Sequence, residues 1–337
     1  MHQLASGTTR ASRASRAKPV SWRDRLRRLV PFLLVLAGVG VLLYPVAATQ
    51  FNNTKQREFA QTYNTEVQQI SQTDRTAGLE EARAYNEALY GIPILDPWLS
   101  EASRTPSGPY VDYLGLLAET GAMARLRVPS INVDLPIYHG TTDDVLAKGV
   151  GHLYGTSLPV GGEGTHSVLT SHTGLSNATL FDHLDDVVEG DIVLVEVLGE
   201  TLAYEVDQIK VVLPHETEDL VTIAGEDYLT LVTCTPYAVN THRLLVRGHR
   251  VPFDESSPEA QQMEEQSGLQ LEPWMYWLLG GAAAGLLVMI WMLVVLNRRR
   301  YPQVAAGDTE SRQGRHRGGG RRRGGRRGQR GRHARAP

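Results

Sequence analysis

The sequence predicts a mainly β domain, closed or sandwich-like, that is tethered to a membrane at both ends. Between about residues 105 and 254, short β-rich runs alternate with Gly and Pro, and no long helices intervene. Long charge-free apolar runs lie on both sides of this region. The chain has 337 residues, of which 42% are hydrophobic and 21% charged, and this composition excludes a wholly disordered chain or a collagen-like fibre.

Two apolar runs, Leu29–Ala48 and Trp274–Leu296, contain no charged residue. A bilayer core of about 30 Å needs about 20 apolar helical residues, so each run is long enough to span it. A cleaved signal peptide ending near Val46-Ala47-Ala48 is the alternative for the first run, but the run is long for that role. We therefore expect two transmembrane helices.

Basic residues are concentrated outside the two apolar runs. Residues 1–28 hold eight Lys/Arg and one acid, and residues 298–337 hold fourteen Arg and two acids, although the net charge of the chain is only −3. The positive-inside rule then places both termini in the cytoplasm and residues 49–273 outside the cell. We expect a two-pass protein of the cell membrane.

The intervening segments follow from composition and periodicity. Apolar residues at Phe59, Tyr63, Val67 and Ile70 predict a helical stalk, which a turn at Thr73–Gly78 interrupts before helix resumes over Leu79–Tyr90. The Arg/Gly-rich tail cannot form a core. We expect it to fix the orientation of the second transmembrane helix and to contact membrane lipid headgroups rather than nucleic acid, so no specific nucleic acid is expected as a partner. The expected order is a basic cytoplasmic N-terminus (1–28), transmembrane helix (29–48), helical stalk and lid (49–104), β domain (105–254), acidic linker (255–273), transmembrane helix (274–296) and cytoplasmic tail (297–337).

Seven strands and two short helices are predicted inside the β domain. The helices are Thr141–Lys148 and Asn177–Asp185. The strands are rich in β-branched residues and end at Gly, Pro or polar residues. They are Ala124–Val128, Val133–Tyr138, Ser167–Ser171, Asp191–Val197, Leu202–Val212, Tyr228–Cys234 and His242–Val251.

The single cysteine, Cys234, has no partner for an intramolecular disulfide, so it is inert, paired between chains, or reactive. It ends a predicted strand, just before Thr235-Pro236. A strand, a loop and a second strand could place Arg243 beside it, where a guanidinium favours a thiolate and donates to an oxyanion. An ion pair between Arg243 and a surface acid is the alternative.

A cysteine nucleophile also needs a proton carrier. His172 follows a predicted strand and opens the turn Ser171-His172-Thr173-Gly174. His242 is the competitor, but strand alternation points its side chain away from the face that carries Arg243. The histidines show no HExxH spacing and no companion cysteine, so we expect no metal.

The run from Thr230 to Cys234 (TLVTC), continuing as TPYAVNTHRLLVRGHR, resembles the active-site signature of sortases, the cysteine transpeptidases of Gram-positive cell surfaces. The resemblance is to the class C, pilus-assembling branch, and it covers about residues 50–296. It implies a sortase-like closed β-barrel, Cys234 as nucleophile, His172 as proton donor and acceptor, and Arg243 as the oxyanion stabiliser.

Class C members also carry an Asp-Pro-aromatic lid, and this chain has Asp96-Pro97-Trp98. The resemblance implies that Trp98 covers the thiol and that Asp96 engages the arginine. One departure is Ala238, where the branch usually has Gly.

The resemblance also implies partners and a reaction without a cofactor. The enzyme would cleave an LPxTG-like sorting signal of a pilin or surface protein between Thr and Gly, through a thioacyl intermediate, and transfer the acyl group to a pilin lysine. A housekeeping sortase that uses a cell-wall precursor is one alternative. A non-enzymatic, bitopic surface receptor with an inert cysteine is the other.

Overall fold

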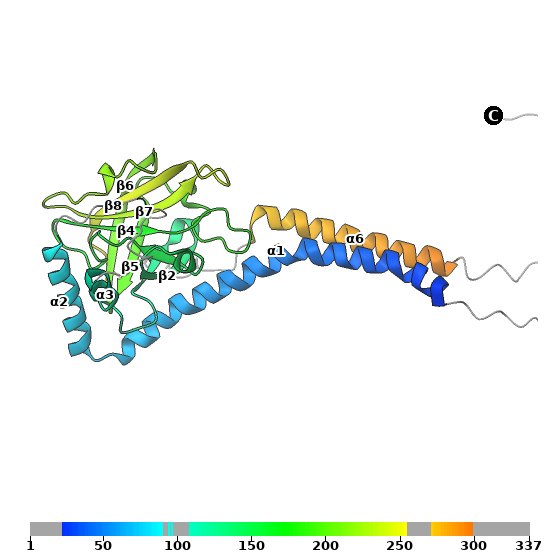
Figure 1. The fold of residues 1–337 in the computed structure, drawn as a ribbon, viewed down its shortest axis with the longest axis horizontal. Helices are drawn as coiled ribbons and strands as arrows, with labels where there is room; N and C mark the ends of the chain where they lie inside the picture. Colours follow the sequence, from blue (N-terminus) through cyan, green and yellow to red (C-terminus); the bar gives the residue numbers. More distant parts are fainter. Residues whose placement is uncertain (1–21, 90–93, 95, 97–107, 255–270, 299–337) are drawn as a thin grey trace, which may run out of the picture. The chain divides into compact units, whose positions relative to one another are not determined.

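The computed structural model describes residues 22–89, 94, 96, 108–254 and 271–298. Within these residues, eight strands close into a barrel in the order β1-β2-β3-β4-β7-β8-β6-β5, with β5 returning to β1 (Figure 1). The mainly β fold is confirmed, and the barrel is closed rather than a sandwich. The strands are β1 Ala124–Val128, β2 Val133–His139, β3 Val150–His152, β4 Thr165–Thr170, β5 Ile192–Val197, β6 Glu200–Val212, β7 Asp227–Thr235 and β8 His242–Val251.

Strand direction decides which side chains meet at the end of the barrel. Strands β4 and β7 run parallel, so their C-terminal ends lie at the same end of the barrel. Strand β8 runs antiparallel to β7 and therefore begins there. The remaining neighbours are antiparallel except β2 and β3.

Alternation along β1 separates the barrel core from a polar outer network. Leu126 and Val128 are fully buried in the apolar core. Arg125, which precedes Leu126, is held by Asp134 (Nε–Oδ1, 2.7 Å) and Glu196 (Nη1–Oε2, 3.0 Å). Successive side chains of β1 thus point to opposite faces of the barrel wall. The buried guanidinium of Arg125 is paired with carboxylates, because a buried charge without a partner is costly.

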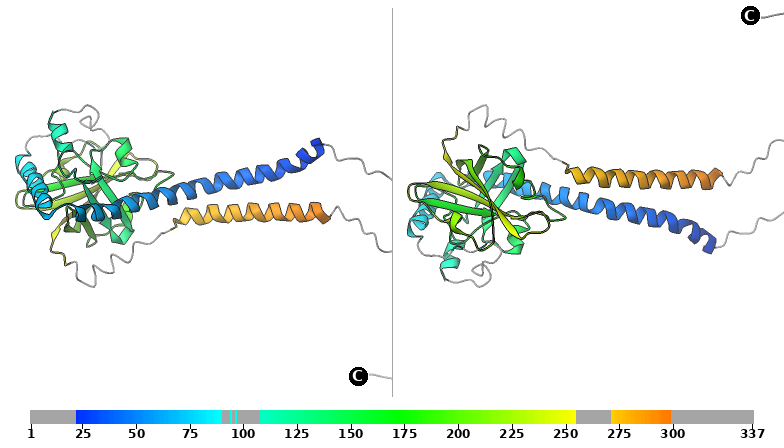
Figure 2. Two further views of the ribbon diagram at one scale, coloured as in Figure 1. Left: turned by 90° about the horizontal axis from the view of Figure 1, so that it is seen from below. Right: turned by 90° about the horizontal axis from the view of Figure 1, so that it is seen from above.

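The helices are α1 Trp22–Gln69, α2 Gln72–Ala88, α3 Gly108–Leu114, α4 Asp143–Leu146 and α6 Pro273–Arg298, and the 3-10 turns are η1 Pro129–Ile131, η2 Leu184–Asp186 and η3 Glu218–Leu220. Two of them, α1 and α6, contain stretches long and apolar enough to cross a membrane, each with mean hydropathy 2.4. Figures 1 and 2 show α2 and α3 against the outside of the barrel, where Leu79 and Tyr113 join its apolar cluster.

The first apolar run and the first half of the stalk form one continuous helix, α1, rather than separate helices. Its C-terminal part is fixed to the barrel through Tyr63, whose hydroxyl donates to the Met123 carbonyl (3.2 Å) and accepts from the Leu198 amide (2.8 Å). The residues that follow the apolar run are therefore part of the domain's packing.

The predicted turn at Thr73–Gly78 is wrong, because these residues lie inside α2. The helix break comes earlier, where the Ser71 hydroxyl caps α2 by accepting from the Asp74 amide (3.2 Å). Gly78 serves close packing instead of ending a helix: a Cβ there would lie 2.9 Å from Cδ1 of Leu198.

The predicted helix at Asn177–Asp185 is also wrong, since only η2 is helical in that region. Leu180 has φ +45°, which interrupts a right-handed helix. Polar contacts from α1 hold the loop in place of internal helical bonds: Asn52 Nδ2 donates to the Asn177 carbonyl (2.8 Å) and Asn53 Nδ2 to Thr179 Oγ1 (2.8 Å). Strand β3 and helix α3 were not predicted.

Candidate active site

Cys234 lies near the end of β7, buried with 8% of its surface exposed. The neighbouring Thr233 hydroxyl donates to the Ser171 carbonyl (2.9 Å), which ties the end of β7 to the chain that leaves β4. The thiol is thus held on a rigid strand at the rim of the barrel.

His172 follows β4 by two residues and is partly buried. The parallel ladder pairs Thr170 with Val232, and the Ser171 amide continues it by donating to the Val232 carbonyl (3.2 Å). His172 and Cys234 each lie two residues beyond the pair of Thr170 and Val232, so both positions are at the same end of the barrel.

Arg243 is the second residue of β8 and lies directly opposite Cys234 in the antiparallel ladder. This is the neighbourhood that the strand–loop–strand pattern predicts. Asp96 engages its guanidinium at two points, Nε to Oδ1 at 2.6 Å and Nη2 to Oδ2 at 2.9 Å. The Nη1 atom donates to the carbonyls of Asn240 (3.3 Å) and His242 (3.1 Å). In this structure these donors of Arg243 are therefore occupied.

The electrostatics of the site favour uncharged forms of Cys234 and His172. Burial raises the pKa of the Cys234 thiol, while Arg243 lowers it and Asp96 raises it. Burial also lowers the pKa of His172, although the Asp143 carboxylate of α4 acts in the opposite direction. Because Asp96 offsets the guanidinium, the site as it stands holds a thiol that is poorly activated.

The structure describes only one residue of the expected lid segment Asp96-Pro97-Trp98. Asp96 is described and buried, with 4% of its surface exposed. Pro97 and Trp98 lie outside the described residues, so the expected cover of Trp98 over the thiol stays a prediction.

The competing histidine, His242, pairs with Thr235 in the ladder, one position away from Cys234. Its Nδ1 contacts the Thr241 hydroxyl at 2.9 Å. His152 is an example of a purely internal histidine: it is enclosed by Tyr113 and Ser157, and burial lowers its pKa to about 4. No group of His, Cys, Asp and Glu that could hold a metal ion occurs among the described residues.

The loop between β7 and β8 approaches the turn that carries His172. A Cβ added to Gly174, which has φ +80°, would lie 3.6 Å from the Ala238 amide nitrogen. Ala238 itself has φ +62°, a left-handed conformation that Gly adopts more easily. The departure noted in the sequence thus falls on a position that demands left-handed backbone.

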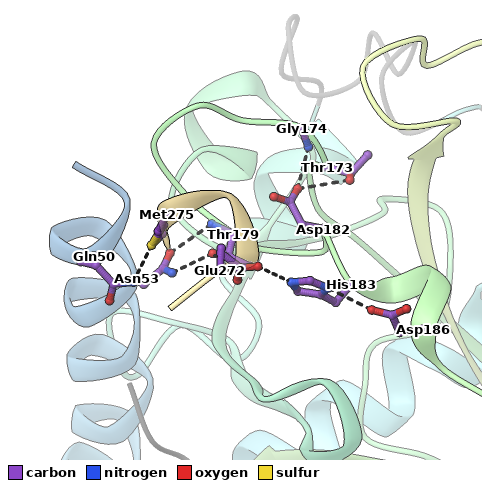
Figure 3. A network of polar contacts seen from close by, with 10 residues as sticks. All are labelled: Gln50, Asn53, Thr173, Gly174, Thr179, Asp182, His183, Asp186, Glu272 and Met275. Carbon is purple, nitrogen blue, oxygen red and sulfur yellow. Dashed lines mark hydrogen bonds and ion pairs between the residues drawn. The ribbon is translucent and has the colours of Figure 1, made fainter. Parts of the chain in front are cut away.

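One site residue was missed by the sequence reasoning. Asp182 accepts at Oδ1 from both the Gly174 amide (2.6 Å) and the Thr173 hydroxyl (3.2 Å), immediately after His172 (Figure 3). No periodicity or motif marks it, because the contact depends on how an irregular loop folds back on itself.

Comparison with known proteins points to one family. The sortase domain matches residues 126–251. The chain is 31% identical over 137 residues to Sortase D of Bacillus subtilis, in a match that covers 40% of this chain and 66% of that protein. Among solved structures, sortase C-1 of Actinomyces oris is 53% identical with a TM-score of 0.53, and the match covers 54% of this chain and 99% of that one.

A second solved structure, Sortase C1 of Streptococcus agalactiae, is 46% identical with a TM-score of 0.51, and the match covers 58% of this chain and 94% of that one. The matched sortase domain contains Cys234, His172 and Arg243. From the matched domain, the barrel and the identity to these structures, it follows that this chain belongs to the sortase family, with class C sortases among its structural neighbours.

Proposed function

We propose that this protein is a membrane-anchored cysteine transpeptidase that polymerises pilins. It cleaves an LPxTG-like sorting signal between Thr and Gly and transfers the new acyl group to a lysine amine of another pilin. The observation that supports the proposal is that Arg243 lies opposite Cys234 in the β7–β8 ladder, while His172 follows β4 at the same end of the barrel. The solved Sortase C of Streptococcus pneumoniae, 43% identical to this chain, is described in terms of its pilin substrate specificity.

The first half of the reaction breaks the Thr–Gly bond. The Cys234 thiol gives its proton to His172 as its sulfur attacks the threonine carbonyl carbon, and the carbonyl oxygen becomes an oxyanion that the Arg243 guanidinium stabilises. When the intermediate collapses, the C–N bond breaks and His172 gives a proton to the leaving amine. A thioester between Cys234 and the threonine remains.

The second half of the reaction consumes that thioester. A lysine amine attacks the thioester carbonyl, gives a proton to His172, and displaces the Cys234 sulfur, which then takes that proton from His172. The product is an isopeptide bond between two proteins, and the enzyme returns to its starting state.

Asp96 regulates the first step in this proposal. Its carboxylate occupies two guanidinium donors of Arg243, so those donors become free for an oxyanion only when the segment that bears Asp96 moves away. A lid mutant of Sortase A from Corynebacterium diphtheriae, 52% identical to this chain, has been solved, so at least one relative has a lid. We include Trp98 in the proposed lid.

The proposed location is the outer face of the cell membrane, with both termini in the cytoplasm. The apolar stretches of α1 and α6 would cross the bilayer, and the basic residues at both ends of the chain would lie inside. The domain order set out from the sequence is part of the same proposal.

The test uses the full chain in detergent with an LPxTG peptide and a lysine-bearing acceptor. Mass spectrometry should detect a thioester on the wild type and a peptide–lysine conjugate, and neither with Cys234→Ala. Transfer to a cell-wall peptide in preference to lysine would favour a housekeeping sortase. Absence of any acyl-enzyme under conditions where the thiol is alkylated would favour the receptor and reject the proposal.

A further inference from the structure

The turn that carries His172 is fixed by a single carboxylate oxygen. Asp182 Oδ1 accepts from the Gly174 amide at 2.6 Å and from the Thr173 hydroxyl at 3.2 Å. The His172 carbonyl accepts in turn from the Phe181 amide (3.1 Å), the residue before Asp182. Phe181 and Asp182 thus hold the His172 carbonyl, the Thr173 hydroxyl and the Gly174 amide, and Figure 3 shows the two contacts that Asp182 makes.

From this geometry we propose that Asp182 is a positioning residue for His172. The carboxylate fixes the Thr173–Gly174 turn, and the turn fixes where the imidazole stands relative to Cys234. The inference rests on the proposed function, because it assigns a role in delivering a proton through His172. Asp182 acts through the backbone and is not itself a catalytic residue.

A charged acceptor strengthens the hold on this turn, because one of its residues is a glycine. Gly174 has φ +80° and contributes no side chain to packing. An ionised carboxylate makes shorter and stronger hydrogen bonds than a neutral group, as the 2.6 Å distance to the Gly174 amide illustrates. A shift of about 1 Å at a reacting group can slow a reaction by about 10²-fold, so the rigidity of this turn matters for the rate.

The Asp182 carboxylate is ionised at neutral pH although its burial disfavours the charged form. Burial raises the pKa of Asp182 from 3.8 to about 6, opposed by the bonds from Gly174 and Thr173 and by His183. The charged and titratable groups that face it are His183, the Glu272 carboxylate at the start of α6, and Tyr237 of the β7–β8 loop. Glu272 raises the pKa further, and it is itself paired with His183 at 2.7 Å.

The sign of the pH effect follows from this raised pKa. Because the pKa in the folded protein lies above 3.8, protonation of Asp182 adds stability as the pH falls from about 6 toward 4. Protonation also removes the charge that holds the turn. Between those values the protein should therefore lose activity while it gains stability from this group.

The experiment compares Asp182→Asn with the wild type in the full-length protein. Asparagine keeps an acceptor oxygen of the same shape and removes the charge. With a sorting peptide at pH 7.5, we expect kcat to fall about tenfold or more with little change in KM. The melting temperature should stay equal or rise, since the buried charge is gone. The acid limb near pH 6 should be absent from the kcat profile of the variant.

The matched control is Asp186→Asn, the same change in the same loop. Asp186 contacts His183 (3.0 Å) with a side chain that is 68% exposed, whereas it is Asp182 that accepts from the Thr173–Gly174 turn. We expect its kcat and pH profile to match those of the wild type. Equal losses in both variants would overturn the proposal, because they would show a general effect of loop charge.

Hydrogen exchange supplies a readout that does not depend on activity. At one pH, the peptide containing the Gly174 amide should exchange at least several-fold faster in Asp182→Asn than in the wild type. Unchanged exchange together with an unchanged pH profile would reject Asp182 as a positioning residue. If the wild type forms no thioester, the proposed function is rejected. Slower exchange of the Gly174 amide in the wild type than in Asp182→Asn would, even then, show that the Asp182 carboxylate holds the turn.

Discussion

Removing the charge of Asp96 should make Cys234 more reactive. In Asp96→Asn the amide keeps the shape of the side chain, but the Arg243 guanidinium is no longer neutralised. Arg243 lowers the pKa of the thiol and Asp96 raises it, so the substitution removes an influence that disfavours the thiolate. We expect faster alkylation of the thiol at neutral pH.

The size of this effect follows from the ladder geometry. Directly opposed residues in an antiparallel ladder lie about 5 Å apart. A unit charge about 6 Å from a thiolate interacts with it by about 3 kcal/mol at an effective dielectric constant of about 20, which limits the gain in thiolate to about 10²-fold. A less basic thiolate is also a weaker nucleophile, by about half of that gain on a logarithmic scale. The expected acceleration is therefore about tenfold.

The assay is the rate of iodoacetamide alkylation across a series of pH values, followed by intact mass. The control is Asp207→Asn, because Asp207 binds Arg247 of the same strand in the same two-point manner (Nε–Oδ1 3.0 Å and Nη2–Oδ2 2.9 Å). That variant should alkylate at the wild-type rate. An unchanged or slower rate in folded Asp96→Asn would refute the view that Asp96 restrains the thiol through Arg243.

Two further predictions concern the histidine and the loop. His172→Ala should nearly abolish cleavage of a sorting peptide, whereas His242→Ala should change it modestly, since His242 pairs with Thr235 rather than Cys234; the reverse ranking, measured as kcat/KM, would reassign the proton carrier. Ala238→Gly should raise the free energy of unfolding by about 1 kcal/mol, because φ +62° strains an alanine and its exposed methyl adds little packing; a lower melting temperature would contradict this account.

The strands were predictable where the sequence pattern and the barrel agree. Strand β8 was predicted with the bounds that the structure shows, because a run of β-favouring residues begins and ends at clear signals. The pairing of Cys234 with Arg243 followed from the length of the loop between two strands. Such local geometry depends on a few neighbouring residues, so it can be predicted from the sequence.

Features that depend on contacts between residues far apart in the chain could not be predicted from the sequence. Gly78 looks like a helix breaker in the sequence, but it lies inside α2, where a Cβ would come close to Leu198 of the barrel. Asn177–Asp185 has helix-like spacing, but contacts from α1 at Asn52 and Asn53 hold it in another conformation. Asp182 was missed for the same reason, since its carboxylate meets its donors, Thr173 and Gly174, only in the folded loop.

The parallel pairing of β4 with β7 also has a consequence for folding kinetics. Thr170 and Val232 are 62 residues apart, as are Ser171 and Thr233, whereas Cys234 and Arg243 belong to a local hairpin. Closing a long loop costs more entropy than closing a hairpin and is therefore slower, so the hairpin can form before the long-range pairing does. Cys234, the proposed nucleophile, is then paired with Arg243 early and joined by His172 only when the barrel wall is complete, so the proposed site is assembled only once the chain has folded.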